Sequence, residues 1–173
     1  MTNAILNVTG INQDDLLKPS STRKYPLGLE VAVVDTATDK IKKYMYVKAH
    51  AALTASTPYV IAFSTVAGSE VKTAAPITDA TDSKRVVVAP VAFTNGYYGF
   101  VQFAGECEVA MSGTHTVDDY LELTSAATQL VANGTSGSTV FDDKACAICA
   151  DISTGAEVAT AILLGATVQT AAS

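Results

Sequence analysis

Residues 95–111 constrain the fold of this chain more than any other stretch of its sequence. They open with Asn95-Gly96, a pair that predicts a type I′ hairpin turn with positive φ at both central residues. The residues that follow alternate along a strand. Val101, Phe103, Cys107, Val109 and Met111 point to one side, whereas Gln102, Glu106 and Glu108 point to the other. Gly105 permits a bend or bulge midway. The stretch therefore predicts an all-β protein built around a long, bent central hairpin.

The remainder of the chain carries further strand patterns. Strands are expected at 27–34, 41–49, 59–65, 85–93, 120–124, 129–132, 144–151 and 157–168. A polar surface loop is expected at 74–84, and Pro90 indicates an edge position or a bulge. Turn signals recur about every ten residues, which favours a sandwich or barrel over a βαβ arrangement. We predict a single compact β-sandwich or barrel-like domain over residues 27–173.

The first 26 residues differ from the rest. They mix short apolar pieces with Asn, Gly, Asp, Pro and Ser and sustain no period. This composition predicts an extended N-terminal arm, residues 1–26, that becomes ordered by packing on another surface. The alternative is a frayed terminus.

The composition limits the partners that the chain can have. Charged residues make up only 16% and hydrophobic residues 49%, which favours a surface covered by further copies or by another protein. A surface rich in Thr, Ala and Ser with nothing attached is the alternative. The net charge of −6 gives no electrostatic reason to bind nucleic acid, since lysines gather only at Lys40, Lys42, Lys43 and Lys48. No apolar run is long enough to span a membrane, and the N-terminus has no signal-peptide pattern, so we expect cytoplasmic synthesis.

Three cysteines argue against a disulfide framework. Cys146 and Cys149 form a CxxC pair, but they lie in an apolar run that reads as a strand, where residues three apart face opposite sides. Burial as small hydrophobic side chains is the favoured interpretation, and metal or redox chemistry is the alternative.

Candidate catalytic groups are few. His115, Asp118 and Asp119 could bind a divalent metal or act in acid–base chemistry, but a polar loop favours local bonds to the backbone. His50 stands alone. The loop aspartates could bind calcium weakly, but their spacing matches no EF-hand and solvated turns are the simpler explanation; they are Asp35, Asp39, Asp79, Asp82, Asp142 and Asp143. We predict no enzyme activity and no catalytic, cofactor-binding or metal-binding residues.

Two stretches resemble the head decoration, or cement, proteins of tailed bacteriophages. Tyr25-Pro-Leu-Gly-Leu-Glu-Val is followed by Tyr46-Val-Lys-Ala-His-Ala-Ala-Leu-Thr-Ala. Gly96-Tyr-Tyr-Gly-Phe-Val-Gln-Phe-Ala-Gly is followed by Asp119-Tyr120-Leu121 and a terminal strand that ends Leu163-Leu164-Gly165. The resemblance covers about residues 25–166. It implies a compact β-domain with an arm, and it transfers no binding residue.

The resemblance also implies a function. Proteins of this family bind the outside of the capsid, usually as trimers, and clamp neighbouring capsomers. The expected function is thus a structural virion protein on the capsid surface, a homotrimer with the major capsid protein as partner and the arm reaching a neighbour or the shell. The alternative is a carbohydrate- or receptor-binding module of a phage fibre or head, with Tyr97 and Tyr98 as a sugar platform.

Overall fold

The computed structural model describes residues 3–5, 11–36, 38–64, 68–72, 84–123, 129–132, 145–165 and 167–168. The predicted all-β class is confirmed, since the described elements are strands and one 3₁₀ helix. In chain order they are β1 (Asn3–Ile5), η1 (Gln13–Leu17), β2 (Glu30–Asp35), β3 (Lys40–Ala49), β4 (Pro58–Ser64), β5 (Gly68–Lys72), β6 (Lys84–Val88), β7 (Tyr98–Met111), β8 (Thr114–His115), β9 (Tyr120–Glu122), β10 (Val131–Ala132), β11 (Ala147–Cys149), β12 (Ser153–Thr154), β13 (Glu157–Leu164) and β14 (Thr167–Val168).

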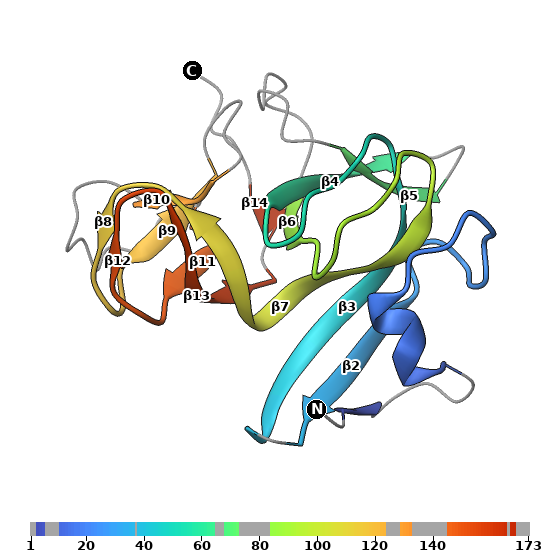
Figure 1. The fold of residues 1–173 in the computed structure, drawn as a ribbon, viewed down its shortest axis with the longest axis horizontal. Coiled ribbons are helices and arrows are strands. Elements are labelled where there is room, and N and C mark those ends of the chain that lie inside the picture. The colour runs from blue at the N-terminus through green and yellow to red at the C-terminus, as the bar shows by residue number, and fades with distance from the viewer. Residues whose placement is uncertain are drawn as a thin grey trace.

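Strand β7 joins the two parts of the molecule (Figure 1). Its first half pairs antiparallel with β3, from Lys48↔Tyr98 to Lys43↔Ala104. Its second half pairs antiparallel with β13, from Leu164↔Ala104 to Glu157↔Met111. The change of partner occurs at the bend. We name the part built on the first half the N-terminal lobe and the part built on the second half the C-terminal lobe.

In each lobe the strand pairings return toward β7. In the N-terminal lobe the order β3-β5-β4-β6-β7 is completed by the β3–β7 ladder. In the C-terminal lobe the order β7-β13-β11-β9-β10 is completed by a bridge between Met111 and Leu130. Neither ring is a closed barrel, because some of its joints are minimal. Strands β6 and β7, for example, share only the pair Val88↔Gln102.

Each ring encloses a core made by alternate side chains. The inner face of the N-terminal ring includes Met45, Val47, Ile61, Val87, Val101 and Phe103. The inner face of the C-terminal ring includes Cys107, Val109, Met111, Leu121, Ala161 and Leu163. The predicted alternation along β7 is therefore confirmed, but its two halves supply two different cores. The continuous apolar run of β6 is also buried on both faces, since Val87 enters one cluster and Val86 and Val88 the other.

The N-terminal ring has an internal pseudo-two-fold symmetry that relates residues 44–64 to residues 84–104. Strand β3 pairs with β7 as β4 pairs with β6, with Val47↔Gly99 matching Tyr59↔Val87 at an offset of 40. The loops exchange bonds reciprocally: the backbone N–H groups of Leu53 and Phe93 each donate to the other's carbonyl, at 3.0 and 2.9 Å. Ser56 likewise donates to Ala89 and Gly96 to Ala49, both at 2.9 Å.

The bend in β7 is a bulge stabilised by a side chain. The register between β3 and β7 shifts between Lys43 and Tyr44, which leaves Phe103 as the extra residue. Gly105 has φ +87°, and a Cβ there would lie 2.3 Å from the carbonyl oxygen of Ile41. The buried Gln102 amide donates to the carbonyl of Glu106 at 2.8 Å and lies 3.2 Å from that of Gly105. Glycine thus permits the bend, and glutamine donates to the carbonyls of Gly105 and Glu106, which lie beyond the end of the β3–β7 ladder.

Two predictions about the Asn95 region are wrong. The turn is not type I′, because Gly96 has φ +80° whereas Asn95 is not among the described residues with positive φ. The bond from Tyr97 N–H to Thr94 O, with that φ at the third residue, is typical of a type II turn. The central element is also no simple hairpin, since β7 takes most of its pairs from β3 and β13.

Other strand predictions hold with altered limits. The β2–β3 hairpin forms as expected, and β6 ends at Val88, before Pro90. The sequence pattern does not predict strand β5: it indicates a turn at 67–69, but Gly68 already pairs with Ser64. The predicted loop at 74–84 lies outside the described residues except for Lys84, which begins β6.

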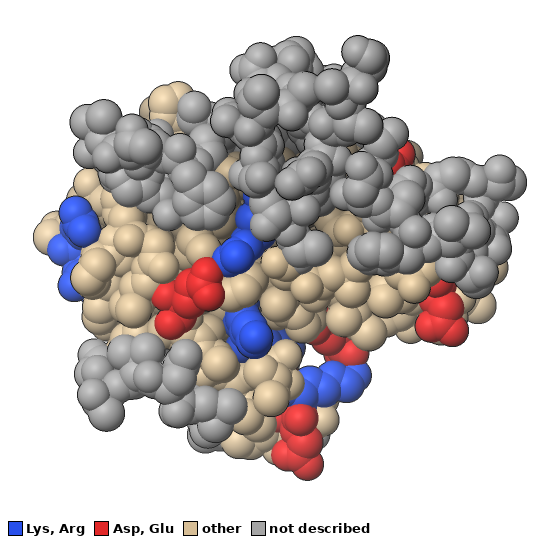
Figure 2. Space-filling view, turned by 180° about the vertical axis from the view of Figure 1, so that it is seen from behind, with Lys and Arg blue, Asp and Glu red and all other residues tan. Residues whose placement is uncertain are grey.

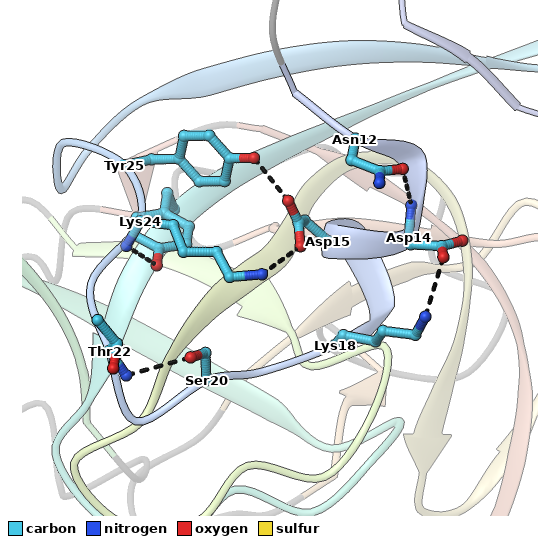
Figure 3. Close-up of polar contacts among 9 residues, drawn as sticks. Asn12, Asp14, Asp15, Lys18, Ser20, Thr22, Lys24 and Tyr25 are labelled. Carbon is cyan, nitrogen blue, oxygen red and sulfur yellow. Dashed lines mark hydrogen bonds and ion pairs between the residues drawn. The ribbon is translucent and has the colours of Figure 1, made fainter.

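The described part of the predicted arm packs on its own domain. β1 pairs with β2, and Leu16 of η1 is buried in a cluster with Val31, Val33, Tyr44, Tyr46 and Phe100. Polar contacts hold the segment in place (Figure 3): the Asp15 carboxylate accepts bonds from Lys24 Nζ and Tyr25 Oη, both at 2.6 Å. These bonds lower the pKa of Asp15 and raise that of Tyr25. A boundary after residue 26 stays a prediction, but residues 11–26 already cover one face of the sheet.

Candidate interaction surface

His115 is a buried residue of the small β8–β12 sheet. It pairs with Ser153 across that sheet and is 1% exposed. Its Nε2 lies 3.0 Å from the carbonyl oxygen of Ser112, so this nitrogen carries the proton and donates. Its Nδ1 has no hydrogen-bond partner in the part of the chain that the structure describes. The polar loop expected around His115 therefore contains a short strand, and the imidazole points into the protein.

The carboxylates near His115 serve the loop itself. Asp119 is buried and accepts a bond from the backbone N–H of Thr116 at 2.8 Å. Asp118 is exposed and adopts φ +72°. Among the described residues no group of three or more His, Cys, Asp or Glu side chains could hold a metal ion. The structure thus brings the three residues into one short stretch around β8, and the bond from Thr116 to Asp119 is of the local kind expected from the sequence.

All three cysteines are free and buried, as the favoured interpretation predicted. Cys107, Cys146 and Cys149 lie in the core cluster of the C-terminal lobe. Burial raises the pKa of Cys107 and of Cys146 to about 12. A thiol held neutral in this way is a poor nucleophile and a poor metal ligand.

The tyrosines of the proposed sugar platform are half-buried. Tyr98 stacks on Tyr46, with ring centroids 6.5 Å apart, and the Nζ of Lys48 lies 6.0 Å from the Tyr98 ring centroid. Tyr98 thus contributes to the aromatic cluster beneath the arm and does not project as a free ring. His50 is exposed at the end of β3.

The loop aspartates and lysines predicted from sequence have separate roles. Asp35 is buried at the end of β2 and forms an ion pair with Lys42, whereas Asp39 is exposed. Lys40 forms an ion pair with Glu106 on β7. The other candidate calcium ligands, Asp79, Asp82, Asp142 and Asp143, lie outside the described residues.

The outer face of the C-terminal ring carries exposed apolar side chains. We define this outer face by Glu106 and Glu108 of β7 and Val158, Thr160 and Ile162 of β13. In the ladder Ile162 lies opposite Glu106 and Thr160 opposite Glu108. Val158 is 53% and Ile162 41% exposed. Ile148 of β11 pairs with Ile162 and extends the face, half-buried. Described charges on the side seen in Figure 2 form a few small groups within a mostly uncharged surface.

A groove borders this outer face where β7 bends. It is lined by Lys40, Ile41, Gly105, Glu106 and Ile162 and has a volume of about 320 Å³. The alternation predicts Ile41 on the core face of its strand with Met45 and Val47, but Ile41 is 52% exposed. The reason is that β3 extends past the N-terminal ring at this end, so that the alternation continues without a core to receive it.

A second, smaller cavity lies where the two lobes meet. Its volume is about 170 Å³, and its lining combines Lys42, Tyr44, Gln102, Cys107 and Glu108 with Ser56, Val88 and Pro90. Burial raises the pKa of Tyr44 to about 12, so its phenol is neutral at physiological pH. Burial keeps the Cys107 thiol of the same lining neutral as well, since its pKa is also raised to about 12.

Sequence reasoning assigned no role to the outer face. The alternation of β13 is visible in the sequence, but it does not reveal which of its two sides lacks a covering layer. The outer face is identified by the pairing of Ile162 with Glu106 and of Thr160 with Glu108. This pairing is known only once the β7–β13 register is known.

Comparisons with known proteins give a distant likeness of fold. No family model matches the chain, and no curated protein matches it. Among solved structures, the chain is similar to the base of the head fiber protein gp8.5 of bacteriophage phi29, with 13% identity and a TM-score of 0.48 over 73% of this chain and 98% of that one. A likeness this distant concerns the path of the chain and says nothing about function. No described helix is long and apolar enough to cross a membrane.

Proposed function

We propose that this chain is a structural virion protein that binds the outer surface of a phage capsid and stabilises it by clamping neighbouring major capsid protein subunits. Its working form is a homotrimer located on the virion. No enzymatic step is part of this proposal. The motifs at Tyr25–Val31, Tyr46–Ala55 and Gly96–Gly105, which resemble the decoration proteins, support it.

The observation that carries the proposal is the outer face. A protein that worked as an isolated monomer would gain nothing from Val158 and Ile162 exposed on one strand with Ile41 nearby. Apolar side chains of this kind stabilise a contact by leaving water when another surface covers them. A repeated lattice multiplies each modest contact, so even small interfaces bind a shell firmly.

The positions of the cysteines and histidines fit a structural role. The thiols of Cys107 and Cys146 are buried with raised pKa values, and His115 is enclosed in a small sheet. Tyr98 is half-buried and stacked on Tyr46, which disfavours the flat exposed pair that the sugar-binding alternative needs.

Sedimentation with empty capsid shells of the parent phage tests the proposal. We expect the protein to pellet with shells at a fixed ratio to capsid subunits and to raise the temperature at which the shells fall apart. The control is the same protein with shells already saturated by an unlabelled excess. Protein that stays in the supernatant at every concentration, with intact shells, would contradict the proposal.

A further inference from the structure

The two lobes differ strongly in charge. Residues 1–104 contain ten Lys and Arg and eight Asp and Glu. Residues 105–173 contain one Lys and nine Asp and Glu. The division falls at the bend in β7, so it coincides with the division between the two rings. Residues 1–104 therefore have a net charge of +2 (10 − 8), and residues 105–173 have a net charge of −8 (1 − 9).

The acidic charge reaches the outer face. Glu106 and Glu108 lie opposite Ile162 and Thr160, and Glu106 is paired with Lys40. Glu108 is exposed and accepts a bond from Thr160 Oγ1 at 3.1 Å, and no Lys or Arg pairs with it in the described part of the chain. The outer face is thus apolar and negatively charged.

The N-terminal lobe has a surface of the opposite kind around Tyr98. We call it the Tyr98 patch and define it by Lys48 and Tyr98 together with Leu17 and Arg23, which lie three residues before and after Ser20 in the chain. The backbone of Ser20 pairs with Tyr98, and the Lys48 ammonium lies over the Tyr98 ring. Leu17 is 54% exposed, and neither Arg23 nor Lys48 forms an ion pair within the described residues. This patch is apolar and positively charged.

We propose that the outer face of one copy binds the Tyr98 patch of a second copy, so that copies associate head to tail. The inference rests on the self-association in the proposed function, for which it names the two contacting surfaces. Face-to-face association about a two-fold axis is disfavoured, because it would bring Glu108, which no described cation neutralises, against the acidic face of the second copy. Head-to-tail contact instead places Glu108 near Arg23 and Lys48 and covers Val158 and Ile162.

Charge reversal in solution, without shells, tests this arrangement. By light scattering over a concentration series, we expect Glu108→Lys and Lys48→Glu each to weaken self-association at least about tenfold. The double variant, Glu108→Lys with Lys48→Glu, should restore it, since the reversed charges meet again across each contact. Circular dichroism confirms that each variant is folded. A double variant as weak as the single ones would overturn the proposal, as would Lys48→Glu that assembles normally.

A matched pair of apolar sites tests the outer face separately. Val158 and Val117 are 53% and 51% exposed, but Val117 lies in the loop after β8. Val158→Asp should weaken self-association at least about tenfold, and Val117→Asp should leave it unchanged. Equal effects, or a wild-type protein that is monomeric at every concentration, would refute the head-to-tail contact. Shell binding is measured independently, so a monomer that still pellets with shells refutes this inference and leaves the virion function standing.

Discussion

The two halves of β7 have different surroundings although they belong to one strand. In the N-terminal lobe Val101 and Phe103 fill the ring, while Phe100 on the opposite face is buried under residues from the arm. In the C-terminal lobe Cys107, Val109 and Met111 fill the second ring, but Glu108 on the opposite face is exposed. The N-terminal lobe thus covers both faces of its strand with its own chain, and the C-terminal lobe covers one. This difference marks the C-terminal lobe as the half with a face left to bind another molecule.

Removing residues 1–26 should give the largest loss of stability, because it uncovers the outer face of the first half of β7, as the outer face of the second half already is. The deletion removes Leu16 and Tyr25 from the cluster that covers Phe100 and Tyr46. Removal of one large buried apolar side chain costs about 2–5 kcal/mol, so we expect a protein that is unfolded or molten at 25 °C. Near-UV circular dichroism and dye binding check this. Deletion of residues 1–10, which keeps η1, is the control and should remain folded.

The bend of β7 that connects the two lobes can be destabilised by a substitution at Gly105. Gly105→Ala forces a side chain to φ +87° and sets its Cβ 2.3 Å from the carbonyl oxygen of Ile41. We expect a loss of at least about 2 kcal/mol in the free energy of unfolding. Gly155→Ala is a matched control, because Gly155 has φ +111° and no atom within 4 Å of its Cβ. Chemical denaturation of both variants measures the difference, and equal losses would show that backbone strain alone matters.

A substitution at Gln102 tests the contribution of one side chain to the same bend. Gln102→Leu keeps the volume and removes the donor that reaches the carbonyls of Gly105 and Glu106. Leaving buried carbonyls unsatisfied costs about 1–3 kcal/mol, and we expect a loss in that range by urea unfolding. Amide exchange should rise near the bend and stay unchanged in β4. An unaltered stability would mean that water replaces the amide.

Acid should weaken the cover of the N-terminal lobe. Bonds from Lys24 and Tyr25 lower the pKa of Asp15 below its usual 3.8. A lowered carboxyl pKa stabilises the folded state above the unfolded pKa, and this stabilisation is lost as the pH falls through the folded one. We expect thermal stability to fall below about pH 4, and the Asp15→Asn variant should be less stable at neutral pH but lose less on acidification. Identical pH profiles for the two proteins would exclude Asp15 as the cause.

The smallest effect is expected on the uncovered face. Ile162→Ala removes a side chain that is 41% exposed, so the free energy of unfolding of the monomer should change by less than about 0.5–1 kcal/mol. Phe100→Ala, at a fully buried position on the covered face, should cost about 3–5 kcal/mol. Urea unfolding at a concentration where the protein is monomeric gives both values. A large loss for Ile162→Ala would show that the outer face is part of the core.

The faces of strands were predictable from sequence, and their partners were not. Alternation placed Val101 and Val109 inward correctly, since a period of two follows from strand geometry alone. It carried no information on the pairing of β7 with β3 and β13, which lie about 50 residues away on either side. Asn95-Gly96 suggested a local hairpin, but the loop is held by bonds to Leu53 and Ala49 from its pseudo-symmetric counterpart. Tertiary contacts overrode the local turn preference.

The candidate surface was predictable only in outline. The low charged fraction pointed to a covered surface, but the outer face depends on the register of β13 against β7. The His115 group and the CxxC pair were interpreted as structural, because loop aspartates and strand cysteines have common roles of this kind, and the burial of His115 and of the three cysteines fits that interpretation. The symmetry of residues 44–64 and 84–104 went unrecognised, although Val47-Lys-Ala-His-Ala-Ala-Leu-Thr54 and Val87-Val-Ala-Pro-Val-Ala-Phe-Thr94 share Val, two Ala and Thr at an offset of 40.

That symmetry has a consequence for how the protein responds to dilution. Two segments that exchange the same pairings about a two-fold axis have the arrangement of a dimer whose chains have been joined. Covalent connection gives each segment a fixed, high effective concentration of the other, so the N-terminal ring persists however dilute the protein becomes. The head-to-tail contact has no such connection, and it therefore forms only where copies accumulate, as they would on a shell that gathers many of them.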